Sequence, residues 1–145
     1  MAESRFLYVI YIRASAETVW AHFTDPAQNK LFWAGYHQRS TWKSGADYEI
    51  VSADGEAWDT GKVLAIEPPR HLQVTWNHQH DAEMKAEGES TVTLDLEEAA
   101  PGVTRLTLSH VIGVANSKLI EAVTGGWPSL LSSLKSLIET GKAIG

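Results

Sequence analysis

The chain has 145 residues, of which 43% are hydrophobic and 21% are charged, a balance typical of one globular domain. Its formal net charge of -6 at pH 7 argues against nucleic acid or an anionic membrane as the main partner, because both are recognised by basic surfaces. Cysteine is absent, which excludes disulfides, a thiol nucleophile and a zinc site built on cysteine.

The first predicted element is a strand over residues 6–12, which is rich in β-branched and aromatic residues and ends at Arg13. This is the longest apolar run, and it is far shorter than the ~20 residues that a membrane span needs. No basic segment precedes it as in a signal peptide. We therefore expect a single domain over residues 1–145, no membrane insertion and a cytoplasmic location.

Two short helices are expected next. Ser15 is a typical N-cap, and the apolar residues that follow recur on one helical face. Asp25 and Pro26 then supply a second cap and a first helical residue. The second helix carries Trp33 and is expected to stop at Gly35.

From residue 36 the pattern changes to a period of two, which is typical of strands. Turn signals separate most of the runs, and Asp54-Gly55 is the clearest hairpin signal among them. Gly61, inside a long run, indicates a bulge or a strong bend. The polar segment 79–88 is predicted to be a solvated loop. The predicted strands are 36–42, 46–52, 56–66, 70–78, 89–97 and 103–111.

A long amphipathic helix is predicted near the C-terminus, with Gly125 and Gly126 freeing the backbone before it, Pro128 in its first turn and Gly141 at its end. Residues 116–124 are expected to form a short helix or an irregular approach to it. One face of the long helix carries apolar residues at steps of three and four, so it needs a partner surface. The chain therefore predicts an α+β fold in which a curved antiparallel sheet of about seven strands wraps around this helix.

Two histidines stand at the ends of alternating runs, so their side chains are expected on the inner face of the sheet. His78 follows Leu72, Val74 and Trp76, and His110 ends a similar run. Each is either a polar anchor in a cavity wall, able to orient a ligand or move a proton, or a strand-end residue paired with backbone or water. The sequence shows no convergent partner that decides between these interpretations.

The aromatic residues allow a similar choice between cavity wall and ordinary core. Six Trp are unusual in a chain of this size. Trp33, Trp76 and Trp127 are candidates for a pocket between the second helix, the sheet and the long helix, and packing explains them at least as well. Tyr48 and Leu131 are further candidates for the inner wall, and the direction of Trp58 stays open. His78-Gln79-His80 has metal-ligand residue types, but no third ligand is fixed, so neither a metal nor a cofactor is predicted.

The whole chain resembles the SRPBCC superfamily, the helix-grip fold of birch-pollen-allergen-like and START-like proteins. Within it, the sequence is most similar to the family named for the activator of the heat-shock-protein-90 ATPase. The residues that carry this resemblance are Ala16-Glu17-Thr18-Val19-Trp20, Phe23-Thr24-Asp25-Pro26, Trp33, Gly55, Gly61-Lys62-Val63-Leu64, Glu67-Pro68-Pro69-Arg70-His71-Leu72, Trp76, Ser90-Thr91-Val92-Thr93-Leu94, Thr104-Arg105-Leu106-Thr107-Leu108, His110, and Gly126-Trp127 leading into Leu130 and Leu134.

The resemblance implies fold more directly than activity. It implies an internal apolar cavity, which members of the superfamily use for lipids, aromatic polyketides or hormones, and hence a small hydrophobic or amphipathic ligand. One alternative is a cyclase or hydratase that uses a His general base. The other is a protein-binding module like the heat-shock-protein-90 activator, whose separate N-terminal domain has no counterpart in this sequence. A homodimer is compatible with all three.

Overall fold

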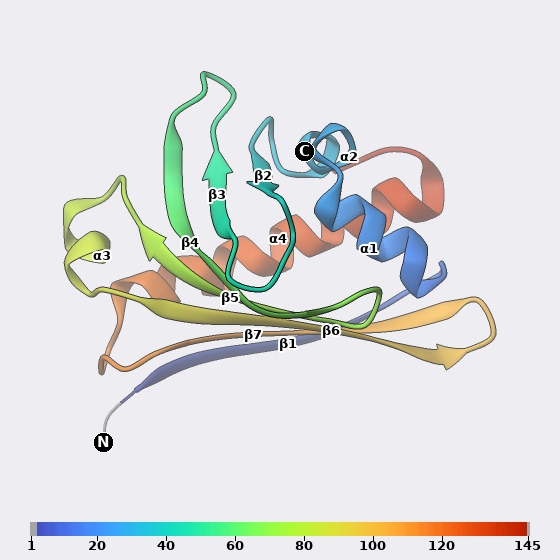
Figure 1. Ribbon diagram of the computed structural model, residues 1–145. Helices are drawn as coiled ribbons and strands as arrows, with labels where there is room; N and C mark the ends of the chain where they lie inside the picture. The colour runs from blue at the N-terminus through green and yellow to red at the C-terminus, as the bar shows by residue number, and fades with distance from the viewer. Residues whose placement is uncertain (1–2, 145) are drawn as a thin grey trace.

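The sheet is the framework of the molecule. In the computed structural model, which describes residues 3–144, seven strands form one antiparallel sheet in the order β1-β7-β6-β5-β4-β3-β2. The sheet curls around the C-terminal helix α4, while α1 and α2 close one end of the space between them (Figure 1). The strands are β1 (Ser4–Ile12), β2 (His37–Ser40), β3 (Asp47–Val51), β4 (Ala57–Glu67), β5 (His71–His78), β6 (Ser90–Ala100) and β7 (Val103–Ile112). This is the α+β fold that the sequence predicts.

The two short helices begin where their capping residues predict. The Ser15 side chain accepts a hydrogen bond from the Thr18 N–H at the start of α1 (Ala16–Thr24). Asp25 caps α2 (Pro26–Phe32) by accepting from the Ala27 N–H at 3.0 Å, and Pro26 is the first helical residue. Local capping chemistry therefore fixes the corner between α1 and α2.

The long helix α4 (Lys118–Thr140) differs from the prediction at its N-terminal end. It begins at Lys118, capped by Ser117, so Gly125 and Gly126 lie inside the helix and Pro128 is an interior residue. The physical reason is burial, because Leu119 and Ile120 pack on Ile112 of β7 and extend the apolar stripe backwards. Gly141 ends the helix with a φ of 85°, as predicted.

The segment predicted as a loop contains one short helix, α3 (Ala82–Ala86). Asp81 caps it by accepting hydrogen bonds from the backbone N–H groups of Glu83 and Met84, both at 3.0 Å. Met84 packs against the cluster that includes Leu119. A cap and the contact of one half-buried side chain therefore order a segment whose polar composition favours a loop.

Gly61 allows β4 and β5 to approach each other closely. A Cβ at this position would lie 1.9 Å from the backbone oxygen of Thr75 on β5. The break in the register of β4 with β5 lies a little further along, between Val63 and Ala65. The predicted irregularity of β4 is therefore present, and the glycine itself is required for backbone contact.

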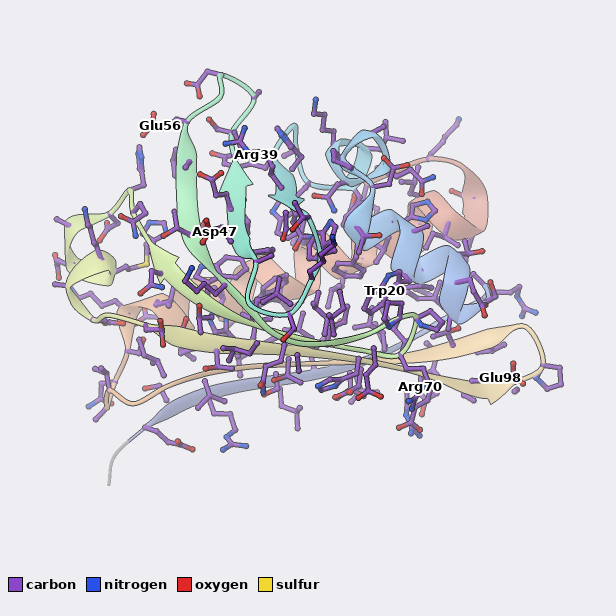
Figure 2. The ribbon with its side chains drawn as sticks, viewed as in Figure 1. Trp20, Arg39, Asp47, Glu56, Arg70 and Glu98 are labelled. Carbon is purple, nitrogen blue, oxygen red and sulfur yellow. The ribbon has the colours of Figure 1, made fainter. Side chains whose placement is uncertain are left out.

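The inner face of the sheet and the facing sides of the helices form the core. Figure 2 shows Trp20 between α1 and the sheet, whereas Arg70, in the turn between β4 and β5, extends into solvent. Leu106, Leu108, Leu131 and Leu134 are at most 1% exposed and join β7 to α4. Within residues 3–144, no helix is long and apolar enough to cross a membrane.

Candidate ligand-binding cavity

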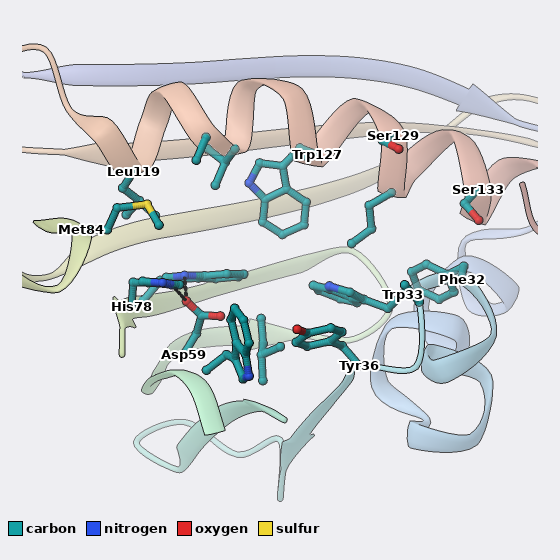
Figure 3. A pocket seen from close by; sticks show the side chains of 18 of the residues that line it. Phe32, Trp33, Tyr36, Asp59, His78, Met84, Leu119, Trp127, Ser129 and Ser133 are labelled. Carbon is teal, nitrogen blue, oxygen red and sulfur yellow. Dashed lines mark hydrogen bonds and ion pairs between the residues drawn. The ribbon is translucent and has the colours of Figure 1, made fainter. Parts of the chain in front are cut away.

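The core is not filled completely. A cavity of about 510 Å³ lies between the end of α2, strands β3 to β5, α3 and α4. Figure 3 shows side chains from the sheet and from α4 facing one another across this space. Aromatic rings make up much of its wall, namely Phe32, Trp33, Tyr36, Trp58, Trp76 and Trp127. The volume lies in the range of ordinary small-molecule sites, roughly 300–1,000 Å³.

One buried carboxylate lies in this apolar wall. Asp59 on β4 is 7% exposed, and it pairs with His78 in the register of β4 with β5. Its Oδ1 accepts two hydrogen bonds, from Trp76 Nε1 at 2.7 Å and from His78 Nδ1 at 2.8 Å (Figure 3). The two donors both come from β5, because Trp76 and His78 project to the same face of that strand. The pair of strands therefore builds a polar anchor inside an aromatic cavity.

The environment of Asp59 opposes its charge. Burial raises the pKa of the Asp59 carboxyl, and the hydrogen bonds from His78 and Trp76 act in the opposite direction. The hydrogen bond to Asp59 places the proton of a neutral His78 on Nδ1, which leaves Nε2 as an acceptor. Nε2 is buried and has no partner among residues 3–144.

His110 lies behind the cavity and is fully paired. Its Nδ1 accepts from Trp127 Nε1 at 3.1 Å, and its Nε2 lies 2.8 Å from Ser90 Oγ. The Ser90 hydroxyl in turn donates to the backbone oxygen of Trp76 at 2.8 Å. Burial lowers the pKa of His110 to about 4, so the ring is neutral near pH 7. His110 therefore joins Trp127 to the sheet beneath it.

The structure brings together four of the seven residues that the sequence singled out. Trp33, Trp76, His78 and Trp127 line the cavity. The other three lie in the layer behind it: His110 as described, Leu131 fully buried in the core, and Tyr48, whose hydroxyl donates to Gln38 Oε1. A ligand-binding role for all seven stays a prediction, and these three can act on a ligand through the residues that they support.

Sequence reasoning missed Asp59, Tyr36 and Met84 as cavity residues, and it left Trp58 open. One signal was present at Asp59, because Asp is depleted in strands and an Asp within a predicted strand needs a partner. His80, the second histidine of the pair considered for metal binding, stacks on Trp58 with ring centroids 3.5 Å apart. No group of three or more His, Cys, Asp or Glu that could hold a metal occurs within residues 3–144.

A curved antiparallel sheet that grips a long C-terminal helix, with a cavity between them, defines a helix-grip domain of the SRPBCC type. The family model described as "Activator of Hsp90 ATPase homolog 1-like protein" matches residues 13–139. The chain belongs to this family. No curated protein sequence matches the chain.

Solved structures repeat the fold at low sequence identity. CalU16 from Micromonospora echinospora has a TM-score of 0.75 at 22% identity, with 93% of this chain and 74% of that chain covered. The Aha1 dimer from Colwellia psychrerythraea has a TM-score of 0.75 at 19% identity, with 97% of this chain and 99% of that chain covered. PFC0360w, an HSP90 activator from Plasmodium falciparum, has a TM-score of 0.68 at 19% identity, with 85% of this chain and 86% of that chain covered. At these identities the likeness establishes the fold and leaves function to the site.

Proposed function

We propose that this protein binds a small apolar or amphipathic molecule in the cavity between its sheet and α4. The observation that carries the proposal is the wall itself, in which aromatic rings surround one buried, hydrogen-bonded carboxylate. A purely structural core closes such a space with side chains, since protein interiors are close-packed. Binding would rest mainly on apolar burial, at about 25 cal/mol per Å² removed from water, with the polar group fixing the orientation.

Two glycines on α4 provide a matched test of this proposal. Both glycines are exposed, but Gly126 lines the cavity and Gly125 does not, and a Cβ at either position meets nothing within 4 Å. Gly126→Leu is expected to fill part of the cavity without displacing a neighbour, and Gly125→Leu makes the same chemical change outside it. Both substitutions replace a helix-interior glycine with a better helix former.

The measurement is a fluorescence titration with the neutral apolar probe N-phenyl-1-naphthylamine. The wild type and Gly125→Leu should bind it saturably and with equal affinity, and Gly126→Leu should weaken binding by at least tenfold. Absence of saturable binding by the wild type would sink the proposal. Equal binding by both variants would show that the probe occupies another surface.

A second candidate is an enzyme in which His78 acts as a general base. The observation that favours it is the 2.8 Å hydrogen bond from His78 Nδ1 to Asp59, which orients the ring and leaves Nε2 to accept a proton. His78→Gln separates the two candidates once a ligand is known. An enzyme should lose turnover by ~10²-fold or more while it still binds that ligand, whereas a binding protein has no turnover to lose.

A further inference from the structure

The cavity wall contains few groups that can carry a charge. Among the described residues that line the cavity, Asp59 is the one carboxylate, His78 is its hydrogen-bond partner, and neither Lys nor Arg is present. An anionic ligand, such as a fatty acid, would meet a buried carboxylate with no Lys or Arg to offset the repulsion. The wall therefore disfavours anions and leaves neutral or cationic molecules.

Asp59 has an oxygen available to a ligand. Both of its hydrogen bonds go to Oδ1, and none from residues 3–144 reaches Oδ2. Figure 3 shows this second oxygen on the side of the carboxyl away from His78. The free oxygen of such a carboxylate is a strong acceptor that has no donor among the described residues.

His78 is bound to the other oxygen of this carboxyl. Its Nδ1 donates to Asp59 Oδ1 at 2.8 Å, and its Nε2 is buried and has no partner among the described residues. The contact with His78 therefore leaves Asp59 Oδ2 free for a ligand.

Further negative charge lies near the cavity. The pKa of Tyr36, which lines it, is raised by burial and by the charges of Asp54, Asp59 and Glu56. Asp54 and Glu56 belong to the turn between β3 and β4. The field at Tyr36 therefore favours a positive charge.

The aromatic rings suit the same kind of ligand. Trp76 and Trp127 pack edge to face with centroids 5.4 Å apart, and Trp33 and Trp127 do so at 5.9 Å. Edge-to-face packing leaves ring faces turned in different directions around the space. The face of an indole attracts a cation within about 6 Å of its centroid, and the attraction grows when water is excluded.

We propose that the cavity takes an organic cation, with its positive charge beside Asp59 Oδ2 and its apolar body against the rings of Trp33, Trp76 and Trp127. This inference rests on the proposed function, since it names the class of molecule that the same cavity binds. A neutral molecule of equal size would fill the space but leave Asp59 Oδ2 without a positively charged partner.

The test compares two probes of nearly equal shape, phenyltrimethylammonium and tert-butylbenzene, as competitors of N-phenyl-1-naphthylamine. The wild type should bind the cation at least tenfold more tightly than its neutral isostere. Asp59→Asn keeps an oxygen for Trp76 and His78 and removes the charge, so it should abolish this preference and leave the affinity for tert-butylbenzene within about twofold. Gly126→Leu should weaken both probes, and Gly125→Leu neither.

Each outcome separates this inference from the proposed function. Equal affinity of the wild type for the two probes would overturn the cation and keep the cavity. A preference that survives in folded Asp59→Asn, or cation binding that survives Gly126→Leu, would place the charge recognition elsewhere and overturn it too. If the wild type binds neither the naphthylamine nor its competitors, the proposed function fails. The wild-type comparison stands alone if Asp59→Asn does not fold.

Discussion

The indole N–H of Trp127 donates to Nδ1 of His110 at 3.1 Å, and this bond joins α4 to β7 directly beneath the cavity. It requires a lone pair on Nδ1, so the imidazole proton is on Nε2 and is donated to Ser90 Oγ. This series of hydrogen bonds ends at the Ser90 hydroxyl, which donates to the backbone oxygen of Trp76. One neutral histidine thus positions two of the cavity's indole rings, one on the helix and one on the sheet.

Protonation of His110 should make folding sensitive to acid. Its folded pKa of about 4 lies below the ordinary value of 6.5, so the unfolded chain binds the proton first as the pH falls. The stability that depends on neutral His110 is present above pH 6.5 and is lost between pH 6.5 and pH 4. We expect this residue alone to lower the free energy of unfolding by about 2 kcal/mol from pH 7.5 to pH 5.

Urea unfolding at both pH values measures this effect. His110→Gln should show a smaller fall in stability between the two pH values than the wild type, because Gln does not titrate. His80→Gln is the control, since it makes the same substitution at an exposed histidine that stacks on Trp58 and takes no part in the hydrogen bonds of His110. An equal fall in His110→Gln and the wild type would rule out this role of His110.

The indole of Trp76 should tune the charge of Asp59. Its hydrogen bond at 2.7 Å is one of the contacts that lower the pKa of this carboxyl against the effect of burial. Trp76→Phe removes the donor and keeps an aromatic ring, so the pKa of Asp59 should rise. A carbon-13 NMR titration of the Asp59 carboxyl reads this directly. Trp127→Phe serves as the control, because Trp127 donates to His110, and a shift of equal size there would contradict the assignment.

Gly61 should be intolerant of any side chain. A Cβ there would meet the Thr75 backbone oxygen at 1.9 Å, and backbone in the middle of a sheet cannot move aside cheaply. We expect Gly61→Ala to lower the free energy of unfolding by about 3 kcal/mol or more. Gly125→Ala, where the Cβ meets nothing within 4 Å, should instead raise it by about 1 kcal/mol. Similar effects of the two substitutions in chemical denaturation would contradict the close approach of β4 to β5.

Local signals predicted the parts of the fold that depend on local chemistry. Ser15, Asp25 and Gly141 mark helix ends because a cap needs only a few neighbouring residues. The predicted start of α4 was wrong because burial of Leu119 and Ile120 outweighs the low helix propensity of the Gly-Gly-Trp-Pro segment. Capping signals do not report this long-range packing.

The candidate site divides in the same way. Alternation along β5 predicts that Trp76 and His78 share a face, and both line the cavity. The contact of Asp59 with His78 depends on the pairing of β4 with β5, which places the two residues opposite each other. Because β4 contains a register shift, counting along the sequence does not give that pairing. Identifying Asp59 as the partner of His78 in the cavity wall therefore required the three-dimensional structure.

Pro128 should weaken α4 where the helix forms the cavity wall. An interior proline has no N–H to donate to the carbonyl four residues earlier, here that of Thr124, and its ring crowds that carbonyl. Gly125 and Gly126 precede it, and glycine has the lowest helix propensity of any residue except proline. Pro128→Ala should raise the free energy of unfolding by about 2 kcal/mol, which is the helix penalty of proline less its restriction of the unfolded chain.

The same substitution tests whether this turn of α4 admits the ligand, since Gly126 and Trp127 line the cavity. Amide hydrogen exchange of residues 124–132 should slow, and the association rate of N-phenyl-1-naphthylamine should fall if this turn opens to admit it. Gly125→Ala is the matched control for helix stability without a restored hydrogen bond. Slower exchange with an unchanged association rate would show that the probe enters elsewhere, and unchanged exchange would show that this turn is held by packing alone.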